Sequence, residues 1–291
     1  MITGDKTTLH ISAAPPAADR RSRDTGYTYD AIIRTCNSLA TAKNTVSSLR
    51  SQSRPPSHII IVDSGSGPDQ KAGLVALADL FIDVSDKPFN YSYSINVALP
   101  KVSSSHALII SSHTWLGDDR VADDLMRTMD NPDCAAAYLQ HEPGRQEWEQ
   151  TKVTASNFNS MNGLSNRCAL IPMARLRARP FREDVFACED QVWAKSVFED
   201  GVSYTMCIDT ARCRTAALEG SQLAKWANEQ VALAYYVDRR RMGARGIVRR
   251  VATGLVFAVL LKWDYARVRF VVAYRLMKAH SKRPNYESKY H

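Results

Sequence analysis

Two acidic segments of this sequence have residue types and surroundings suited to hydrogen-bonding or acid–base chemistry. The first is Asp63, which follows an apolar run and opens the sequence Asp-Ser-Gly-Ser-Gly. Its carboxylate could accept hydrogen bonds from a base imide or a ribose hydroxyl. The glycines permit close backbone approach to a ligand, although the segment is no Walker or Rossmann fingerprint. An equally open interpretation is that Asp63 caps a turn, for which this sequence is well suited.

The second segment is the adjacent pair Glu189 and Asp190. The pair precedes the apolar residues Val192, Trp193 and Ala194, so we expect it at the N-terminus of a helix. The helix field favours the ionised carboxylate there, which suits a general base. Taken alone, the pair is more readily explained as an acidic N-cap, which contributes about 1 kcal/mol.

The elements expected around these segments form a β-α-β unit. Residues 29–37 and 58–67 each read as a buried strand that ends in small polar residues, and 39–52 has helical spacing of its apolar residues. Ligands of such units bind beyond the carboxyl ends of the strands. Further strands are expected at 80–84, 106–111, 134–139 and 202–208, helices at 74–79, 118–129, 190–201 and 221–241, and a surface loop at 140–154. This alternation predicts an α/β fold with a mostly parallel sheet covered on both faces.

Charge and cysteine content narrow the class of protein. The net charge is +8, but residues 238–291 contain 14 Lys+Arg and 3 Asp+Glu, a net charge of +11, which leaves −3 for the rest. An anionic partner is therefore expected for the C-terminal segment alone. The six cysteines include no Cys-x-x-Cys pair, which indicates reduced thiols in a cytoplasmic setting. Residues 1–27 lack an apolar run and are expected to form a flexible tail, not a signal peptide.

Four segments occur in an order that resembles the family 2 glycosyltransferases, which are inverting sugar-nucleotide enzymes with a glycosyltransferase-A fold. The segments are Ile32 to Asn37, Ile59 to Gly67, Phe89-Asn90-Tyr91-Ser92-Tyr93-Ser94-Ile95-Asn96, and Pro180-Phe181 through Glu189-Asp190-Gln191-Val192-Trp193-Ala194. The third is most similar to bacterial transferases that build cell-surface polysaccharides. The resemblance implies a Rossmann-like, mixed, mostly parallel sheet flanked by helices, with a catalytic nucleotide-sugar-binding domain at 28–218 and a basic, amphipathic helical extension at 219–291.

The resemblance also implies roles for individual residues. Asp190 would be the general base that takes the proton from the acceptor hydroxyl, with Glu189 as its neighbour. Nucleotide-sugar binding is expected of Arg34, Thr35, Asn37, Asp63, Lys87, Asn96 and Ser112. Within that set, Thr35 and Asn37 would line the nucleotide pocket, Asp63 would hold the base or ribose, and Asn96 would support the nucleotide-sugar.

One departure from the family pattern bears on the cofactor. Family members usually carry Asp-x-Asp after the fourth strand, where carboxylates hold a divalent ion. Here the matching stretch is Ser111-Ser112-His113-Thr114, with no carboxylate before Asp118. A Mg or Mn ion held by His113 and phosphates would be bound weakly. An equally open interpretation is that His113 hydrogen-bonds the substrate or a loop and binds no metal. Lys87 or Arg34 could instead supply the positive charge, so metal dependence stays open at this point.

The C-terminal segment is expected to form one or two long helices over 246–283. Its apolar run, Val251 to Leu261, has eleven residues and is too short to span a bilayer. Cations and aromatic residues surround this run, which is typical of a helix lying in a membrane interface. The alternative is a helix packed on the catalytic domain with a solvated basic rim. The interfacial interpretation places the protein in the cytoplasm, peripheral to the inner face of the plasma membrane, near a lipid-linked acceptor.

Three functional hypotheses follow. We prefer a glycosyltransferase that moves a sugar from a nucleotide-sugar donor to a glycan or lipid-linked acceptor. The absent Asp-x-Asp motivates the second, a non-catalytic nucleotide-sugar or glycan-binding member of the same fold. The third, nucleic-acid binding, is disfavoured because the main body is nearly neutral and carries no recognised nucleic-acid motif.

Overall fold

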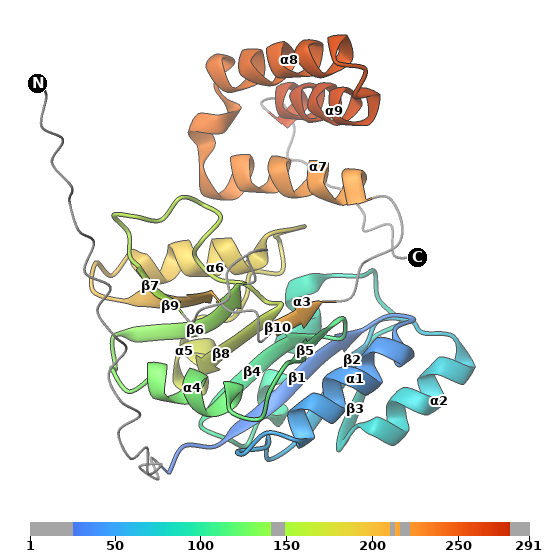
Figure 1. Ribbon diagram of the computed structural model, residues 1–291, viewed down its shortest axis with the longest axis vertical. Coiled ribbons are helices and arrows are strands. Elements are labelled where there is room, and N and C mark those ends of the chain that lie inside the picture. Colours follow the sequence, from blue (N-terminus) through green and yellow to red (C-terminus); the bar gives the residue numbers. More distant parts are fainter. Residues whose placement is uncertain (1–25, 141–148, 210–212, 216–221, 280–291) are drawn as a thin grey trace, which may run out of the picture.

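The computed structural model describes residues 26–140, 149–209, 213–215 and 222–279. Most of the expected flexible tail, residues 1–25, lies outside the described residues. The described chain forms a central sheet flanked by helices, with three C-terminal helices stacked beyond one face (Figure 1).

The central sheet is mixed and mostly parallel. Its strands are β1 (Tyr29–Thr35), β2 (Ile59–Asp63), β3 (Leu80–Asp83), β4 (His106–Ser111), β6 (Cys134–Gln140), β7 (Glu149–Val153), β8 (Cys168–Pro172) and β9 (Tyr204–Asp209). They lie in the order β3-β2-β1-β4-β8-β6-β9-β7. The pairs among β3, β2, β1 and β4 are parallel, as is β6 with β9. Two antiparallel strands complete the sheet: β8 lies between β4 and β6, and β7 lies along β9. A separate antiparallel pair, β5 (Thr114–Leu116) and β10 (Cys213–Thr215), follows the end of β4.

Helices cover both faces of the sheet. One face carries α1 (Leu39–Arg50), α2 (Pro68–Leu77) and α4 (Val121–Thr128), and the other carries α3 (Tyr91–Asn96), α5 (Met173–Ala178) and α6 (Glu189–Phe198). The strands β1, β2 and β4 carry apolar residues on both faces because both faces are buried.

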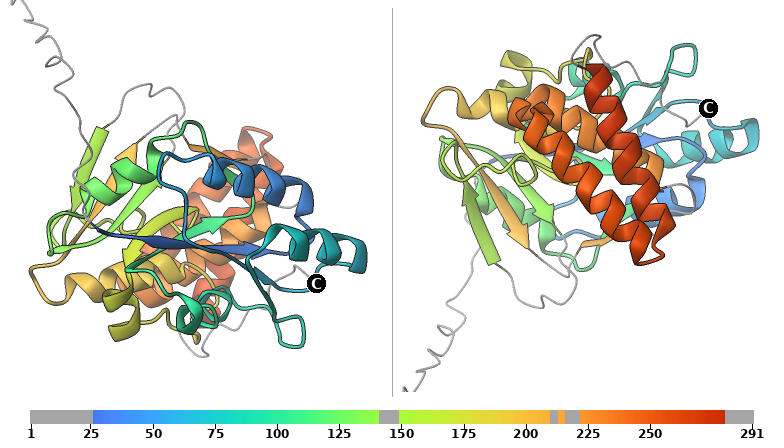
Figure 2. Two further views of the ribbon diagram at one scale, coloured as in Figure 1. Left: turned by 90° about the horizontal axis from the view of Figure 1, so that it is seen from below. Right: turned by 90° about the horizontal axis from the view of Figure 1, so that it is seen from above.

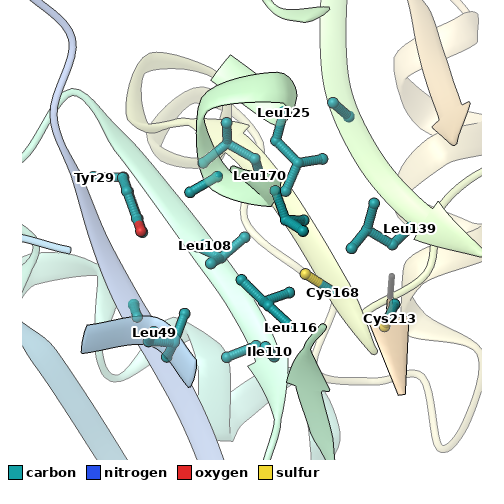
Figure 3. Close-up of a cluster of buried hydrophobic side chains, with 14 of the residues drawn as sticks. Tyr29, Leu49, Leu108, Ile110, Leu116, Leu125, Leu139, Cys168, Leu170 and Cys213 are labelled. Carbon is teal, nitrogen blue, oxygen red and sulfur yellow. The ribbon is translucent and has the colours of Figure 1, made fainter. Parts of the chain in front are cut away.

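Two hydrophobic clusters, one on each face, hold these layers together. Successive strand residues point to opposite faces, so Ile33 belongs to the cluster under α1 while Ile32 belongs to the cluster under α6. The first cluster includes Leu49, Leu108 and other fully buried side chains (Figure 3). Burying each such side chain stabilises the fold by about 1.5–3 kcal/mol. Together the clusters fix the strand ends at which the polar residues lie.

Several elements differ from the sequence expectations. Helix α2 begins at Pro68 and not near residue 74, because Gly67 adopts an extended N-cap conformation and Pro68 fits the first turn. Strand β7 lies inside the stretch expected to be a loop; its polar residues suit a strand at the edge of a sheet. The strands β8, β5 and β10 were not expected either. Strands β5 and β10 have only three residues each, and β8 ends at a proline.

The C-terminal helices form a separate layer. The layer consists of α7 (Gln222–Ala232), a π-helical turn η2 (Leu233–Val237), a 3₁₀ turn η3 (Arg239–Met242), α8 (Ala244–Val259) and α9 (Trp263–Ala279). Helices α8 and α9 lie side by side, beyond α7 from the sheet (Figures 1 and 2). The helix expected over 221–241 is therefore interrupted, and the segment after residue 243 forms two helices. Within the part of the chain that the structure describes, no helix has the length and apolarity needed to cross a membrane.

Candidate active site

Asp63 organises the turn after β2. Its Oδ1 accepts hydrogen bonds from Thr35 Oγ1 (2.9 Å) and Ser66 Oγ (2.5 Å), and its Oδ2 accepts from the backbone N–H groups of Ser66 (2.9 Å) and Gly65 (3.3 Å). The residue is fully buried. These contacts use about all four lone-pair positions of a carboxylate. In this conformation Asp63 therefore caps the turn and fixes Thr35, which is the second interpretation of the sequence.

Asn37 joins the ends of β1 and β2. Its backbone N–H donates to Ser66 Oγ (2.8 Å), and its Oδ1 accepts from the backbone N–H of Gly67 (2.9 Å). Its φ of 48° lies in the left-handed region, which asparagine tolerates better than most residues. The side chain is exposed, and its Nδ2 donates to no other described residue. Asn37 thus presents an amide donor at the strand tips.

Ser112 and His113 follow β4 and face helix α1. Ser112 Oγ accepts a hydrogen bond from Ser38 Oγ (2.8 Å), and Ser112 is buried. The His113 Nδ1 and Thr41 Oγ1 atoms are 3.2 Å apart. Both residues therefore tie the end of β4 to the first turn of α1.

Glu189 and Asp190 form the first turn of α6, at the same edge of the sheet as the end of β1. Arg34 Nη1 lies 3.2 Å from Glu189 Oε1, and Asn166 Nδ2 donates to the same oxygen (3.0 Å). Asp190 accepts from the backbone N–H groups of Asn166 (3.3 Å) and Gln191 (2.8 Å). Helix α6 begins here because Cys188 adopts a left-handed conformation with φ of 61°. Such strain in a non-glycine residue is frequent at functional sites.

Two consecutive residues of β1 connect the acidic groups. Thr35 contacts Asp63 on the face covered by α1, whereas Arg34 contacts Glu189 on the face covered by α6. The structure therefore brings Asp63 and the Glu189–Asp190 pair to one edge of the sheet, from opposite faces.

The environment of Asp190 favours its protonated form. Loss of hydration, followed by the neighbouring Glu189 charge, raises the pKa of Asp190 to about 7, although the two backbone hydrogen bonds and Arg34 oppose the rise. A carboxylate with a pKa near neutrality can both accept and release a proton at physiological pH.

Asn166 is a residue that the sequence analysis missed. It is buried and lies directly before β8, a strand that was not expected. Its Oδ1 and the Nε of Arg34 are buried without a hydrogen-bond partner in the described structure. Such orphaned atoms call for a partner, because nearly all buried polar groups in proteins are hydrogen-bonded. A hydroxyl that entered beside Glu189 could supply one.

Two residues expected to bind the nucleotide-sugar, Asn96 and Lys87, make their contacts away from Asp63 and Asp190. Asn96 Nδ2 donates to Phe181 O (2.7 Å) and Glu183 Oε1 (2.9 Å), so its side chain secures the segment before α6. Lys87 is exposed, and its Nζ lies 3.0 Å from the hydroxyl of Tyr93 and 4.6 Å from the centre of that ring. Neither side chain joins the hydrogen-bonded groups around Asp63 and Asp190.

A comparison with known families matches this domain. The sequence model of "Glycosyl transferase family 2" matches residues 30–188, which is 159 of the 291 residues. The chain belongs to this family. It is a glycosyltransferase, and the matched range ends directly before Glu189. No curated protein matches the sequence.

Solved structures show that the fold of this family 2 glycosyltransferase is of the glycosyltransferase-A type. Mannosyltransferase PcManGT from Pyrobaculum calidifontis, in complex with GDP-Man and Mn²⁺, has a TM-score of 0.57 and 13% identity over 89% of this chain and 76% of its own. S. aureus TarS with UDP-GlcNAc has a TM-score of 0.55 and 16% identity over 89% and 93%. Glucosyl-3-phosphoglycerate synthase from Mycobacterium tuberculosis, with Mn²⁺, UDP and phosphoglyceric acid, has a TM-score of 0.55 and 13% identity over 72% and 78%. At these identities the similarity shows the fold alone.

The residues after β4 do not fit a divalent ion of the kind bound by PcManGT. Mg²⁺ and Mn²⁺ prefer carboxylate and other oxygen ligands. Here Ser112 is turned into α1, and His113 offers an imidazole whose Nδ1 lies beside Thr41. The described residues contain no group of three or more His, Cys, Asp or Glu side chains that could hold a metal. The residues after β4 therefore lack the ligand set of a Mg²⁺ or Mn²⁺ site.

Proposed function

We propose that this glycosyltransferase inverts the configuration of the transferred sugar and uses Asp190 as its general base. The donor is a nucleotide-sugar, and the acceptor is a hydroxyl of a glycan or lipid-linked saccharide in surface polysaccharide synthesis. The observation that carries the proposal is the position of Asp190: it lies at the N-terminus of α6, beside the end of β1, with its pKa raised to about 7.

The chemistry is a single in-line displacement. The acceptor oxygen attacks the anomeric carbon while its proton passes to the Asp190 carboxylate. The bond from the anomeric carbon to the nucleoside diphosphate breaks on the opposite face of the sugar, and the diphosphate leaves with the electron pair. A positioned general base contributes about 10²- to 10⁴-fold to such a rate. The backbone N–H of Asn166 orients Asp190, and Glu189 with the Asn166 side chain supplies the polar surroundings for the hydroxyl.

Arg167 is our candidate for neutralising the departing diphosphate. Arg34 already pairs with Glu189, and Lys87 contacts Tyr93. Arg167 follows Asn166, and its backbone oxygen accepts from Ser111 N–H (3.0 Å) at the end of β4. Its side chain is exposed and makes no hydrogen bond or ion pair within the described residues. A guanidinium there matches the fork geometry of phosphate oxygens.

We further propose that the C-terminal helices bind an anionic membrane surface, at the inner face of the plasma membrane. Helix α8 buries only Gly254, against Phe270 of α9. Helix α8, its link to α9 and the start of α9 expose large apolar side chains, including Leu255 (57%), Val259 (82%) and Trp263 (64%). Exposed cations lie among them: Arg249, Lys262 and Arg267. This combination suits a helix pair at a lipid interface, where it would hold the enzyme near a lipid-linked acceptor.

The test of the base compares Asp190→Asn with Asp69→Asn, since both residues lie in the first turn of a helix. We expect Asp190→Asn to lose at least about 10²-fold in kcat with unchanged binding of the nucleotide-sugar, whereas Asp69→Asn retains both. Full activity of Asp190→Asn would overturn the assignment. A wild-type protein that binds nucleotide-sugars but transfers no sugar to any acceptor would favour the non-catalytic alternative.

A further inference from the structure

A pocket of about 220 Å³ that is open to the surface, here called the cavity, lies between the segment that leads to the base and the C-terminal layer. Arg182 and Asp184 line it from the segment before α6, and Tyr235, Tyr236 and Arg239 line it from η2 and η3. The family match covers residues 30–188 only, so the second wall comes from a part of the chain outside it. The cavity is smaller than the sites of roughly 300–1,000 Å³ that hold drug-sized ligands. It therefore suits one sugar ring or one charged group and not a whole nucleotide-sugar.

The walls of the cavity are held in place by a contact across it and by contacts within each wall. Tyr236 donates its hydroxyl to Asp184 O (3.0 Å), and Arg182 forms two hydrogen bonds to the Asp184 carboxylate (2.7 and 3.0 Å). The rings of Tyr235 and Tyr236 meet edge to face, with centres 4.9 Å apart. The cavity is thus built before any ligand arrives.

The π-helical turn explains why the two tyrosines reach the cavity. Leu233 and Val237, at its two ends, are buried with Val185 and Val192 beneath the segment before α6. A π-helix inserts an extra residue into a turn, and here the intervening Tyr235 and Tyr236 line the cavity. Such turns occur frequently at functional sites, where a regular helix would aim its side chains elsewhere.

The charge of the cavity is positive. Its lining carries two guanidinium groups and one carboxylate, and Arg182 already pairs with that carboxylate. The Arg239 guanidinium lies 5.6 Å from the centre of the Tyr235 ring and pairs with no carboxylate of the described residues. Nearby Glu183 is engaged by Asn96. An anionic group would match Arg239, and the apolar face of a sugar ring would match the two tyrosines.

The cavity is also close to the base along the chain. Asp184 precedes Asp190 by six residues, which span at most about 20 Å when fully extended. The intervening segment is held against the C-terminal layer, since Phe186 packs on Tyr236 with ring centres 5.7 Å apart. The Asp184 wall of the cavity is therefore only six residues from Asp190, the group that would deprotonate a saccharide bound there.

We propose that this cavity binds a negatively charged group, phosphate or carboxylate, on the acceptor saccharide. The proposal rests on the transferase function proposed above and names the acceptor as an anionic saccharide. It also gives the C-terminal layer a part in acceptor selection.

The test measures binding of three small probes by saturation-transfer NMR and titration: glucose 6-phosphate, glucuronic acid and glucose. We expect at least one charged sugar to bind at least about tenfold more tightly than glucose, because hydrogen bonds to charged groups are the stronger ones. The phosphate and carboxylate arms distinguish the two sources of charge. Arg239→Gln should abolish the preference, whereas Arg245→Gln, an exposed arginine of α8 outside the cavity, should retain it.

Failure of this proposal can be told apart from failure of the proposed base. Asp190→Asn should lose transfer yet bind the charged sugar as the wild type does. An active Asp190→Asn variant that keeps the Arg239-dependent preference would overturn the base but support the cavity. Equal binding of all three probes, no binding of any, or an unchanged preference in a folded Arg239→Gln variant would overturn the cavity proposal.

Discussion

Replacing Asp190 by asparagine is expected to stabilise the protein increasingly as the pH rises. The folded state raises the pKa of Asp190 from 3.8 to about 7, chiefly through loss of hydration and the Glu189 charge. Each pKa unit corresponds to about 1.4 kcal/mol. Ionised Asp190 therefore lowers the free energy of unfolding by at most about 4 kcal/mol, and by less where water reaches this partly exposed carboxyl.

The direction of this change in stability with pH follows from the pH at which the unfolded and the folded state each lose the Asp190 proton. Between about pH 4 and pH 7 the unfolded chain has released the Asp190 proton while the folded chain still holds it. Because the folded state then binds more protons, this group makes stability fall as the pH rises through that window and stay level above it. Asparagine does not titrate, so the variant lacks this fall. Its loss of one accepted backbone hydrogen bond adds a cost that does not depend on pH.

The assay is urea denaturation of wild type and variant at pH 5 and pH 8. The difference in unfolding free energy should change in favour of Asp190→Asn by up to about 3 kcal/mol between the two pH values. The control Asp69→Asn, on an exposed first turn, should show no comparable change. A difference between wild type and Asp190→Asn that stays constant from pH 5 to pH 8 would refute the reasoning, because the carboxyl would then be hydrated as in the unfolded chain.

Three further outcomes are expected. Glu189→Gln should shift the rising limb of the pH profile of kcat/KM to lower pH, since it removes the negative charge beside Asp190; an unshifted limb would contradict the coupling. Thr35→Val should cost about 1–3 kcal/mol in urea denaturation, because buried Asp63 loses a hydrogen-bond donor, and wild-type stability would show that the contact is dispensable. Val259→Gln should weaken binding to anionic vesicles by up to about tenfold in sedimentation assays, and equal sedimentation would argue against an apolar contact there.

The sequence predicted the elements that are buried on both faces. The isoleucines of β1 and β2 form short apolar runs that end in polar residues, so the positions of these strands and the polar tips after Thr35 and Asp63 were predicted correctly. Strand β7 escaped prediction because its residues, Glu149 to Val153, carry the pattern of a solvated edge. Tertiary pairing with β9, which no local pattern reports, makes it a strand.

The same limit applies to the candidate site. The first turn of α6 and its acidic pair could be predicted because local composition and helix chemistry coincide there. Asn166 could not, since it contacts Glu189 only after β8 enters the sheet between β4 and β6. Asn96 has a polar amide side chain that could bind a ligand, but its contacts with Phe181 and Glu183 depend on the tertiary fold and could not be predicted from the sequence.

The place of β8 has a consequence for synthesis on the ribosome. Strand β4 pairs with β1 on one side and β8 on the other, yet β8 leaves the ribosome about sixty residues after β4. Until then, a nascent chain ending near residue 160 has an apolar β4 edge open to other chains. Truncated fragments of that length, once released, should aggregate, whereas released fragments extending past Pro172 can cover the edge with their own strand.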